Sequence, residues 1–107
     1  MIIELLTTDS YIILNKKLIK TIGLNETILL GELCGECYYW MKQNKLENGW
    51  FYSTVDNVKY NTSLSDSQQR NAIKKLKDLG IIDYQQKGLP AKRWFKINEE
   101  ELEKIFL

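Results

Sequence analysis

Apolar residues recur with the period of a helix most regularly between residues 65 and 79, in the segment SDSQQRNAIKKLKDL. The positions of this apolar stripe are Ala72, Ile73, Leu76 and Leu79. Spacing of three or four residues places them on one side of a helix. Ser65 and Gln68 have the spacing of a capping box, in which each side chain bonds a backbone amide of the first turn. Gly80 is the predicted helix end, because glycine enters the left-handed conformation at little steric cost.

Two more helices are predicted in the first half of the chain. A brief helix begins at Asn15, carries apolar residues at helical spacing and ends at Gly23. A longer helix, capped by Asn25, is predicted over residues 26–43. Its broad apolar face consists of Leu29, Leu30, Leu33, Cys34, Cys37, Trp40 and Met41. This face is wider than one small core needs, so the helix is predicted either to form the centre of the core or to contact a second copy of the chain.

Short β-prone segments accompany these helices. Residues 11–14 are β-branched and apolar, which predicts a strand or an extended arm. Residues 50–52, Trp-Phe-Tyr, predict a short strand. Ser53 is the predicted cap of a helix over residues 54–60. The polar residues 61–63 then form a tight turn into the helix that starts at residue 65.

The last third of the chain predicts a hairpin and a final helix. Residues 81–86 and 93–97 are the two strands, and residues 87–91 supply glycine and proline for the turn between them. Alternation gives two pairs that share a face, Ile82 with Tyr84 and, toward the core, Phe95 with Ile97. Asn98 is predicted to cap an acidic helix over residues 99–106, whose glutamates suit its positive N-terminal end.

This order of elements predicts an α+β fold of the winged helix-turn-helix type, mainly helical, with a small antiparallel hairpin (the wing) and a short third strand. A chain of 107 residues has room for one core of ordinary size, so one domain is expected over residues 1–107. Residues 1–24 would form an N-terminal arm and a short helix, residues 25–97 the winged-helix core, and residues 98–107 the C-terminal helix.

Composition and charge restrict the classes of function that fit this chain. The chain is 44% hydrophobic and 27% charged, which is typical of a folded globular protein. Residues 53–97 hold nine Lys and Arg against four Asp, whereas residues 1–52 and 98–107 both carry an excess of acidic residues. A basic middle segment suits one face turned to a polyanion. No segment approaches the length of a membrane span and the N-terminus has no signal pattern, so a cytoplasmic protein is expected.

The absence of histidine from the sequence bears on catalysis and metal binding. It excludes Ser-His, Cys-His and His-metal chemistry within one chain. Cys34 and Cys37 have CxxC spacing, but zinc needs four ligands and the segment lies within a predicted helix. We therefore interpret them as buried structural cysteines. The sequence predicts no enzyme, no metal site and no cofactor.

A resemblance to a known class of proteins follows from three pieces of sequence. They are GWFY at residues 49–52, TSLSDSQQRNAIKKLKDLGII at residues 62–82 and KGLPAKRWFKIN at residues 87–98. Together they resemble winged helix-turn-helix domains of replication and accessory proteins from phages and plasmids of low-GC Gram-positive bacteria, including the N-terminal domain of DnaD. The preceding YIILNKKLIKTIGLNETILLGEL is similar to the region before the motif in such proteins.

The resemblance implies which side chains contact double-stranded DNA. Residues of the helix over 65–79 would enter the major groove, and they are Ser67, Gln68, Arg70, Asn71 and Lys74. Lys92 and Arg93 of the wing would meet phosphates or a narrow minor groove. Lys59, Lys75, Lys77 and Lys87 are further phosphate candidates. The alternative is an ordinary helix whose charged face only meets solvent.

The aromatic residues near the wing also have two interpretations. Trp50, Tyr84 and Trp94 are either base-stacking residues or packing residues of the sheet. Packing is the interpretation that we favour, because aromatic side chains mostly bury.

The function implied is sequence-specific binding of double-stranded DNA by an accessory protein of a mobile element, which marks an origin of replication or of conjugative transfer. Initiators and loaders of this kind usually carry a second domain, which favours an accessory role here. The alternatives are a transcriptional regulator of the same fold, or a protein-interaction module such as a replisome adaptor or phage inhibitor. Expected partners are DNA, replication or transfer proteins, and a second copy bound through the helix with Cys34, Cys37 and Trp40.

Overall fold

A three-stranded antiparallel sheet and five helices make up the part of the chain that the structure describes, residues 11–106 of a computed structural model. The strands are β1 (Trp50–Tyr52), β2 (Ile82–Lys87) and β3 (Lys92–Ile97), in the order β1-β3-β2. The helices are α2 (Lys16–Ile22), α3 (Leu24–Lys42), α4 (Val55–Thr62), α5 (Asp66–Asp78) and α6 (Glu99–Phe106). The predicted α+β class is confirmed. The predicted arm and short helix spanned residues 1–24, of which residues 1–10 lie outside the described residues. Residues 11–15, predicted as a strand or an extended arm, form neither helix nor strand.

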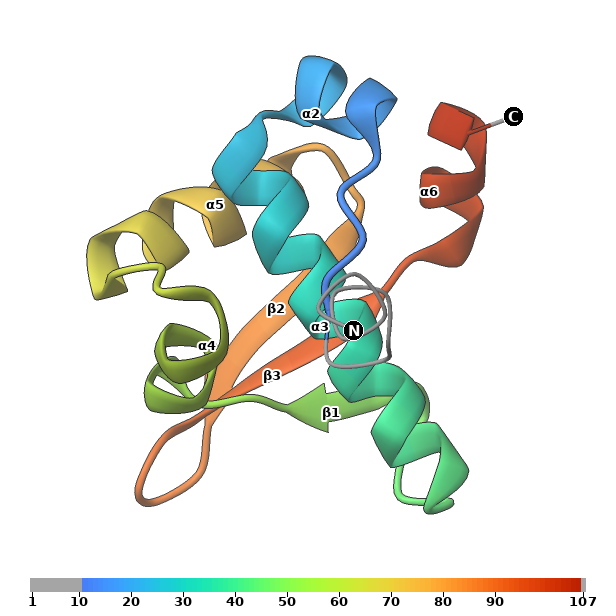
Figure 1. Ribbon diagram of the computed structural model, residues 1–107. Coiled ribbons are helices and arrows are strands. Elements are labelled where there is room, and N and C mark those ends of the chain that lie inside the picture. The colour runs from blue at the N-terminus through green and yellow to red at the C-terminus, as the bar shows by residue number, and fades with distance from the viewer. Residues whose placement is uncertain (1–10, 107) are drawn as a thin grey trace, which may run out of the picture.

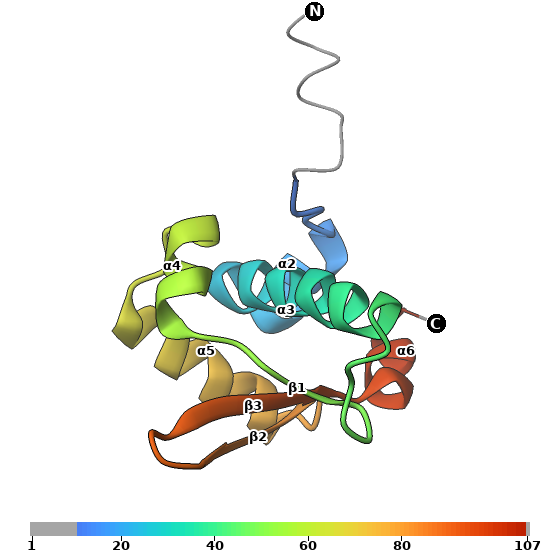
Figure 2. The same cartoon turned by 90° about the horizontal axis from the view of Figure 1, so that it is seen from below.

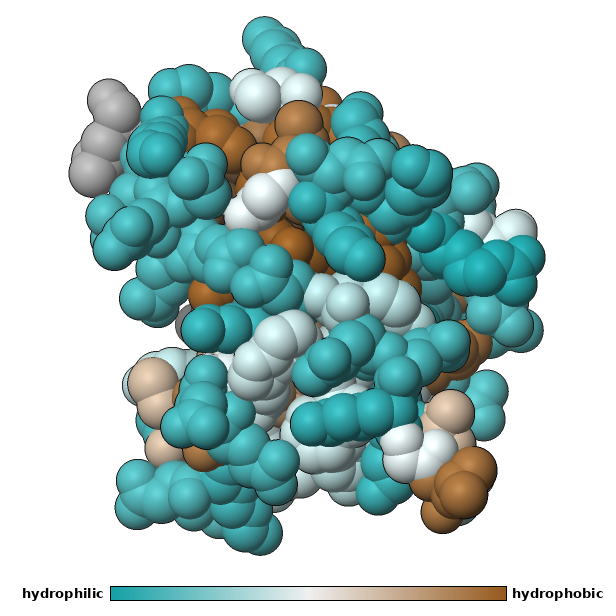
Figure 3. Space-filling model, turned by 180° about the vertical axis from the view of Figure 1, so that it is seen from behind, coloured by the Kyte–Doolittle hydropathy of each residue, from teal (hydrophilic) through white to brown (hydrophobic). Residues whose placement is uncertain are grey.

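The helices are distributed unequally around the sheet. In Figure 1, α3 crosses in front of the strands, while α4 and the hairpin turn lie at one end and α6 at the other. Figure 2 shows α2 and α3 as a layer on one side of the sheet. Seen from behind, the surface is mostly hydrophilic, with hydrophobic atoms between the polar side chains of the upper half and also at the lower right, where the hairpin turn lies (Figure 3). Leu89 of that turn is fully exposed.

One apolar core joins α2–α5 to the sheet. Its buried residues are Leu18, Ile22, Leu29, Leu30, Leu33, Phe51, Val58, Leu64, Ala72, Ile73, Leu76, Ile81, Ile82 and Phe95. Phe51 lies opposite Phe95 in the pairing of β1 with β3, and Tyr84 lies opposite Phe95 in the pairing of β2 with β3. The predicted inward position of Phe95 is confirmed. No helix within residues 11–106 is long and apolar enough to cross a membrane.

Two predicted helix caps were wrong. Helix α3 begins at Leu24 rather than after Asn25, and Gly23 precedes it with a φ of 106°. Glycine adopts this φ without strain, so the chain can turn from α2 directly into α3. Helix α4 is capped by Thr54, whose side chain accepts a hydrogen bond from the Asn57 amide, and not by Ser53. Ser53 instead continues the pairing of β1, donating its amide to the Arg93 carbonyl at 3.1 Å.

The apolar stripe of α5 ends one turn earlier than predicted. Leu79 is 48% exposed because it is the C-cap residue, beyond the helical turn that faces the core. Gly80 ends the helix, as predicted, with a φ of 77°. The Ile81 amide then bonds the Leu76 carbonyl, and Ile81, not Leu79, is buried in the core.

The broad apolar face of α3 is only partly covered. Cys34 and Cys37 are free and half-buried, and both pack against the core, as do Leu102 and Ile105 of α6. The cysteines predicted to be buried and structural are thus half-buried and packed against the core. Met41, predicted on the same face, is 50% exposed at the C-terminal end of α3.

Candidate nucleic-acid interface

Helix α5 has one buried and one exposed side, and its cap is as predicted. The Ser65 hydroxyl accepts from the Gln68 amide at 3.2 Å, and the Gln68 side chain accepts from the Ser65 amide at 2.8 Å. The buried side consists of Gln69, Ala72, Ile73 and Leu76. The exposed side carries Ser67, Gln68, Arg70, Asn71 and Lys74, all five of the residues predicted to enter the major groove. The structure therefore brings these residues together on one helix.

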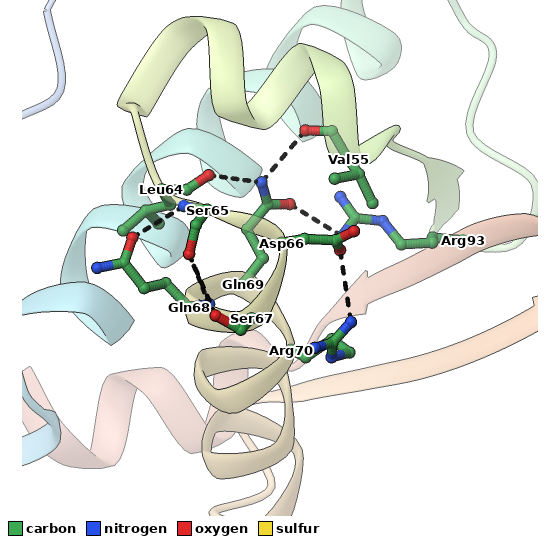
Figure 4. Close-up of polar contacts among 9 residues, drawn as sticks. All are labelled: Val55, Leu64, Ser65, Asp66, Ser67, Gln68, Gln69, Arg70 and Arg93. Carbon is green, nitrogen blue, oxygen red and sulfur yellow. Dashed lines mark hydrogen bonds and ion pairs between the residues drawn. The ribbon is translucent and has the colours of Figure 1, made fainter.

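Among the five exposed residues of α5, Gln68 also has a structural role. Its side-chain oxygen is engaged in the capping box, while its side-chain nitrogen points away from the helix in Figure 4. Reading adenine with a glutamine requires both the oxygen and the nitrogen of the amide. Gln68 can therefore offer a base its nitrogen, but its oxygen only if the capping box opens.

Two of the exposed cations pair with acids on the same helix. Arg70 lies 3.9 Å from Asp66, and Lys74 donates to Asp78 at 2.8 Å. The hydrogen bond and negative charge of Asp78 raise the pKa of Lys74. Exposed pairs of this kind contribute little to stability, so both cations can turn to a phosphate at small cost.

A groove of about 620 Å³ lies between α5 and β2. Its lining consists of Val55, Asp66, Arg70, Ile73, Lys74, Lys77, Tyr84, Gln86 and Arg93. Four of these side chains are cationic and one is acidic, so the groove is electropositive. The pattern of the helix alone does not indicate that Tyr84 and Gln86 complete the groove, because these two residues belong to strand β2.

Arg93 does not lie on the exposed wing, where it was predicted. Arg93 is 8% exposed, and its Nε donates to the Ser53 carbonyl at 3.0 Å. Its Nη1 donates to the Gln69 side-chain oxygen, also at 3.0 Å (Figure 4). The reason is strand alternation: Arg93 stands two residues before the inward-facing Phe95 and therefore points to the same side. Burial lowers the pKa of Arg93, while Tyr84 acts in the opposite direction.

Gln69 completes this arrangement and was missed in the sequence. It is fully buried, and its side-chain nitrogen donates to the carbonyls of Val55 and Leu64 at 3.2 and 3.0 Å. We call the three residues Ser53, Gln69 and Arg93 the Arg93 link, because they connect α4 and α5 to the sheet. A signal was present in the sequence, since Gln69 falls at helical spacing within the apolar stripe.

One atom of the Arg93 link remains open. Nη2 of Arg93 is buried and has no hydrogen-bond partner in the described part of the chain, although Arg93 lines the groove. A buried donor without a partner is costly. The groove thus has one buried, unpaired donor beside it, in addition to the exposed cations Arg70, Lys74 and Lys77.

The wing lysines lie on the other face of the hairpin. Lys87 pairs with Lys92 across the strands, and alternation places Lys92 opposite in direction to Arg93. Lys87 Nζ lies 4.8 Å from the centre of the Trp94 ring, and Lys92 Nζ lies 4.7 Å from that of Tyr52. The structure thus separates Lys87 and Lys92 from the groove.

The aromatic residues near the wing pack within the sheet region. The ring centres of Trp94 and Tyr52 lie 5.7 Å apart, and those of Tyr84 and Phe95 lie 5.1 Å apart. Trp50, Tyr84 and Trp94 are all half-buried. These contacts fit the packing interpretation of the sequence.

The remaining phosphate candidates have different surroundings. Lys59, Lys75 and Lys77 are exposed. Lys75 lies 4.0 Å from Glu26 of α3, and only Lys77 of the three lines the groove. Within residues 11–106, no group of three or more Cys, Asp or Glu side chains is arranged to hold a metal ion.

Comparison of the chain with models of protein families, with curated proteins and with solved structures gave no match.

Proposed function

We propose that this domain is a winged helix-turn-helix that binds double-stranded DNA, with α4 and α5 as the helix-turn-helix and the β2–β3 hairpin as the wing. Helices α4 and α5 are joined by a turn of three residues in which Ser63 adopts a φ of 65°. Helix α5 then presents its polar side outward. This is the arrangement in which the second helix of the motif enters the major groove.

The observation that carries the proposal is the electropositive groove beside the exposed side of α5. Arg70 and Lys74 belong both to that side and to the groove lining, so one DNA strand can meet both surfaces. Asn71 suits adenine, and Arg70 and Lys74 suit guanine or phosphate. Arg93 is a positioning residue in this proposal, since its guanidinium holds α5 to the sheet.

The wing lysines add contacts with the DNA backbone. Lys87 and Lys92 are exposed near the turn, at the end of the molecule where α4 also lies (Figure 1). Each lysine that neutralises a phosphate releases counterions and makes affinity depend on salt. These two residues contribute affinity and not sequence preference.

The biological role we propose is that of an accessory protein, without enzymatic activity, that marks an origin of replication or of conjugative transfer on a mobile element. It rests on the sequence resemblance to phage and plasmid replication proteins. A cytoplasmic location and a homodimer belong to the same proposal, because origin sites are commonly read by symmetric pairs of domains. A transcriptional regulator would use the same contacts at a promoter.

The test measures binding of labelled duplex DNA over a range of salt concentrations. Replacing Arg70, Asn71 and Lys74 with alanine should abolish discrimination between selected and random duplexes. Replacing Lys87 and Lys92 should weaken binding to both duplexes alike and reduce the slope of log affinity against log salt by about two.

Matched control variants lie on α2. This helix carries three exposed lysines, Lys16, Lys17 and Lys20, which are distant in sequence from α5 and from the hairpin. Replacing them with alanine should leave the discrimination between selected and random duplexes unchanged. Retained discrimination in the Arg70, Asn71 and Lys74 variant would remove α5 as the reading element. Absence of duplex binding at low salt would overturn the whole proposal.

A protein-interaction module is the second candidate, and one observation favours it. Tyr38, Tyr39 and Met41 are each at least half exposed at the C-terminal end of α3. Exposed aromatic and methionine side chains are enriched at protein interfaces. This candidate predicts no salt-dependent binding of duplex DNA.

A further inference from the structure

The sheet has a second face, on the side away from the core. Phe51, Phe95 and Tyr84 are paired across the three strands and point toward the helices. Alternation turns the residues between them to the opposite side, which we call the outer face. In Figure 2, no helix of the described residues lies below the strands, on the side away from α2 and α3. The aromatic and basic residues of the outer face are Trp50, Tyr52, Lys87, Lys92, Trp94 and Lys96.

Two aromatic rings lie side by side on the outer face. Tyr52 of β1 pairs with Trp94 of β3, and their ring centres are 5.7 Å apart. Trp50 precedes Tyr52 by two residues on the same strand, so it lies on the same face about 7 Å farther along. The apolar core of the described residues includes none of these three rings. Packing of the core therefore does not explain why aromatic residues occupy this face.

Lysine ammonium groups lie over two of the rings. Nζ of Lys92 is 4.7 Å from the centre of the Tyr52 ring, and Nζ of Lys87 is 4.8 Å from that of Trp94. Both lysines are exposed, so each ammonium can move from its ring to a phosphate. A base stacked on an aromatic ring stabilises a complex more than an exposed cation does over the same ring. A nucleotide can therefore replace each ammonium over its ring while the lysine pairs with the phosphate.

The charge of the outer face also suits a nucleic acid strand. Its three lysines stand against one acidic residue, Asp83. Aromatic rings interleaved with lysines are typical of surfaces that bind single strands, because a single strand offers both free base faces and phosphates. In a duplex the bases stack on each other, so the rings would gain little. A protein partner could cover the rings, but it would need acidic side chains opposite the lysines.

A hollow of about 390 Å³ extends the outer face beside β1, an edge strand of the sheet. Its lining includes Trp40, Tyr52 and Trp94 and, from the loop after α3, Asn44 and Lys45. The ring centres of Trp40 and Tyr52 are 5.3 Å apart. The volume is within the range of small-ligand sites, so the hollow can admit one base. Asn44 and Lys45 supply polar groups for a base edge or a phosphate.

We propose that the outer face of the sheet binds single-stranded DNA. Bases stack on Tyr52, Trp94 and Trp50, and the lysines of this face pair with the phosphates. The choice of DNA over RNA rests on the proposed function, because a domain that holds a duplex at an origin meets the strands that open there. The stacking itself does not rest on it, since the outer face shares no residue with α5 or with the groove beside it.

The experiment follows the tryptophan fluorescence of the full chain during titration with oligothymidylate of about 12 nucleotides at low salt. The three tryptophans of the chain, Trp40, Trp50 and Trp94, all lie on the outer face or line the hollow. Stacking should therefore quench the emission, and the quenching should saturate. A strand of abasic deoxyribose phosphates has the same charge but no bases, and it should bind at least tenfold more weakly.

Variants locate the binding on the outer face, with the anisotropy of a labelled strand as the measurement. Trp94→Leu should weaken binding about tenfold, whereas Trp94→Phe, which keeps a ring, should stay within about threefold of the native affinity. Tyr38→Leu is the matched control and should bind normally. Tyr38 is an exposed tyrosine with Lys42 Nζ 4.5 Å from its ring centre, but it lies on α3 and not on the sheet.

Absence of saturable binding to oligothymidylate, equal binding of the abasic strand, or unchanged binding in folded Trp94→Leu would overturn the proposal and leave the outer face to a protein partner. Thermal unfolding checks that each variant folds. If Trp94→Leu does not fold, the abasic strand decides alone. Oligodeoxyuridylate and oligouridylate differ only in the 2′-hydroxyl, and tighter binding of oligouridylate would overturn the assignment to DNA.

The two DNA proposals fail separately. Replacing Arg70, Asn71 and Lys74 with alanine should change single-strand binding little. Trp94→Leu should leave the discrimination between selected and random duplexes unchanged. Loss of one activity without the other therefore shows which of the two proposals is wrong.

Discussion

Arg93 has two sets of neighbours, and each predicts a different role. In the sequence it adjoins Lys92 in a basic turn, which indicates contact with a polyanion. In the structure its side chain lies with Phe95 beneath α5 and bonds Ser53 and Gln69. Alternation along the strand decides between the two, because adjacent residues of a strand point to opposite faces.

The first prediction concerns the partners of Arg93. Arg93→Met should lower the free energy of unfolding by about 1–3 kcal/mol, since it leaves the Gln69 oxygen and the Ser53 carbonyl without their donor. Adding Gln69→Leu should cost less than the sum of the two single changes, because an apolar pair leaves fewer buried polar atoms unsatisfied. Urea unfolding of the four proteins measures both effects.

Lys92→Met is the matched control for this cycle. It also replaces a cationic side chain with methionine, at the adjacent, exposed position, and its effect on the free energy of unfolding should stay within about 0.5 kcal/mol. Strict additivity of Arg93→Met and Gln69→Leu would contradict the Arg93 link.

At the scale of elements, α5 is the part best predicted from its sequence. Its cap, the part of its stripe at Ala72, Ile73 and Leu76, and its end at Gly80 arise from interactions within a few residues, which local pattern can show. The start of α3 was predicted poorly, because Gly23 makes the turn from α2 by a backbone conformation and not by a side-chain cap. The groove was not predicted at all, since Tyr84 and Gln86 reach it only through tertiary packing.

The second prediction tests the capping box of α5. Ser65→Ala should lower the free energy of unfolding by about 1 kcal/mol, because the Gln68 amide loses its acceptor at the first turn. Ser67→Ala, two residues later on the exposed side, is the control and should have little effect on stability. Thermal or chemical denaturation distinguishes the two, and equal effects would mean that the cap contributes nothing specific.

At the scale of the whole molecule, the surroundings of the two cysteines show how the ends of the domain cover α3. Ile12, before α2, and Leu102 of α6 share a cavity lining with Cys34, although the three residues are far apart in sequence. Burial, and next Cys37 and Glu99, raise the pKa of Cys34 to about 11. Burial also raises the pKa of Cys37. Both cysteines are therefore held as thiols at neutral pH.

The third prediction follows from the raised pKa values of the two thiols. At about pH 8, Cys34 should be alkylated roughly a hundredfold more slowly than an unperturbed cysteine, because only the thiolate reacts. Its rate should rise to the ordinary value when urea unfolds the domain. Mass spectrometry of peptides after iodoacetamide treatment measures both thiols. Fast reaction of Cys34 in the native protein would show that α6 does not stay packed.

The separation of acidic and basic residues also belongs to this scale. The excess of positive charge in residues 53–97 falls on α5 and the hairpin, whereas α6 begins with three glutamates. In Figure 1 the hairpin turn and α6 lie at different ends of the molecule. Such a molecule would approach a polyanion with one end first, which increases the rate of productive encounters.

The Arg93 link affects whether the protein or the DNA would deform when the two bind. Hydrogen bonds from one guanidinium hold α5, the end of β1 and β3 together, so the spacing between helix and hairpin cannot adjust freely. If the domain contacts a duplex with both α5 and the hairpin, the bending and twisting must occur in the DNA. Sites with easily deformed steps such as TA would then be preferred at base pairs that no side chain touches.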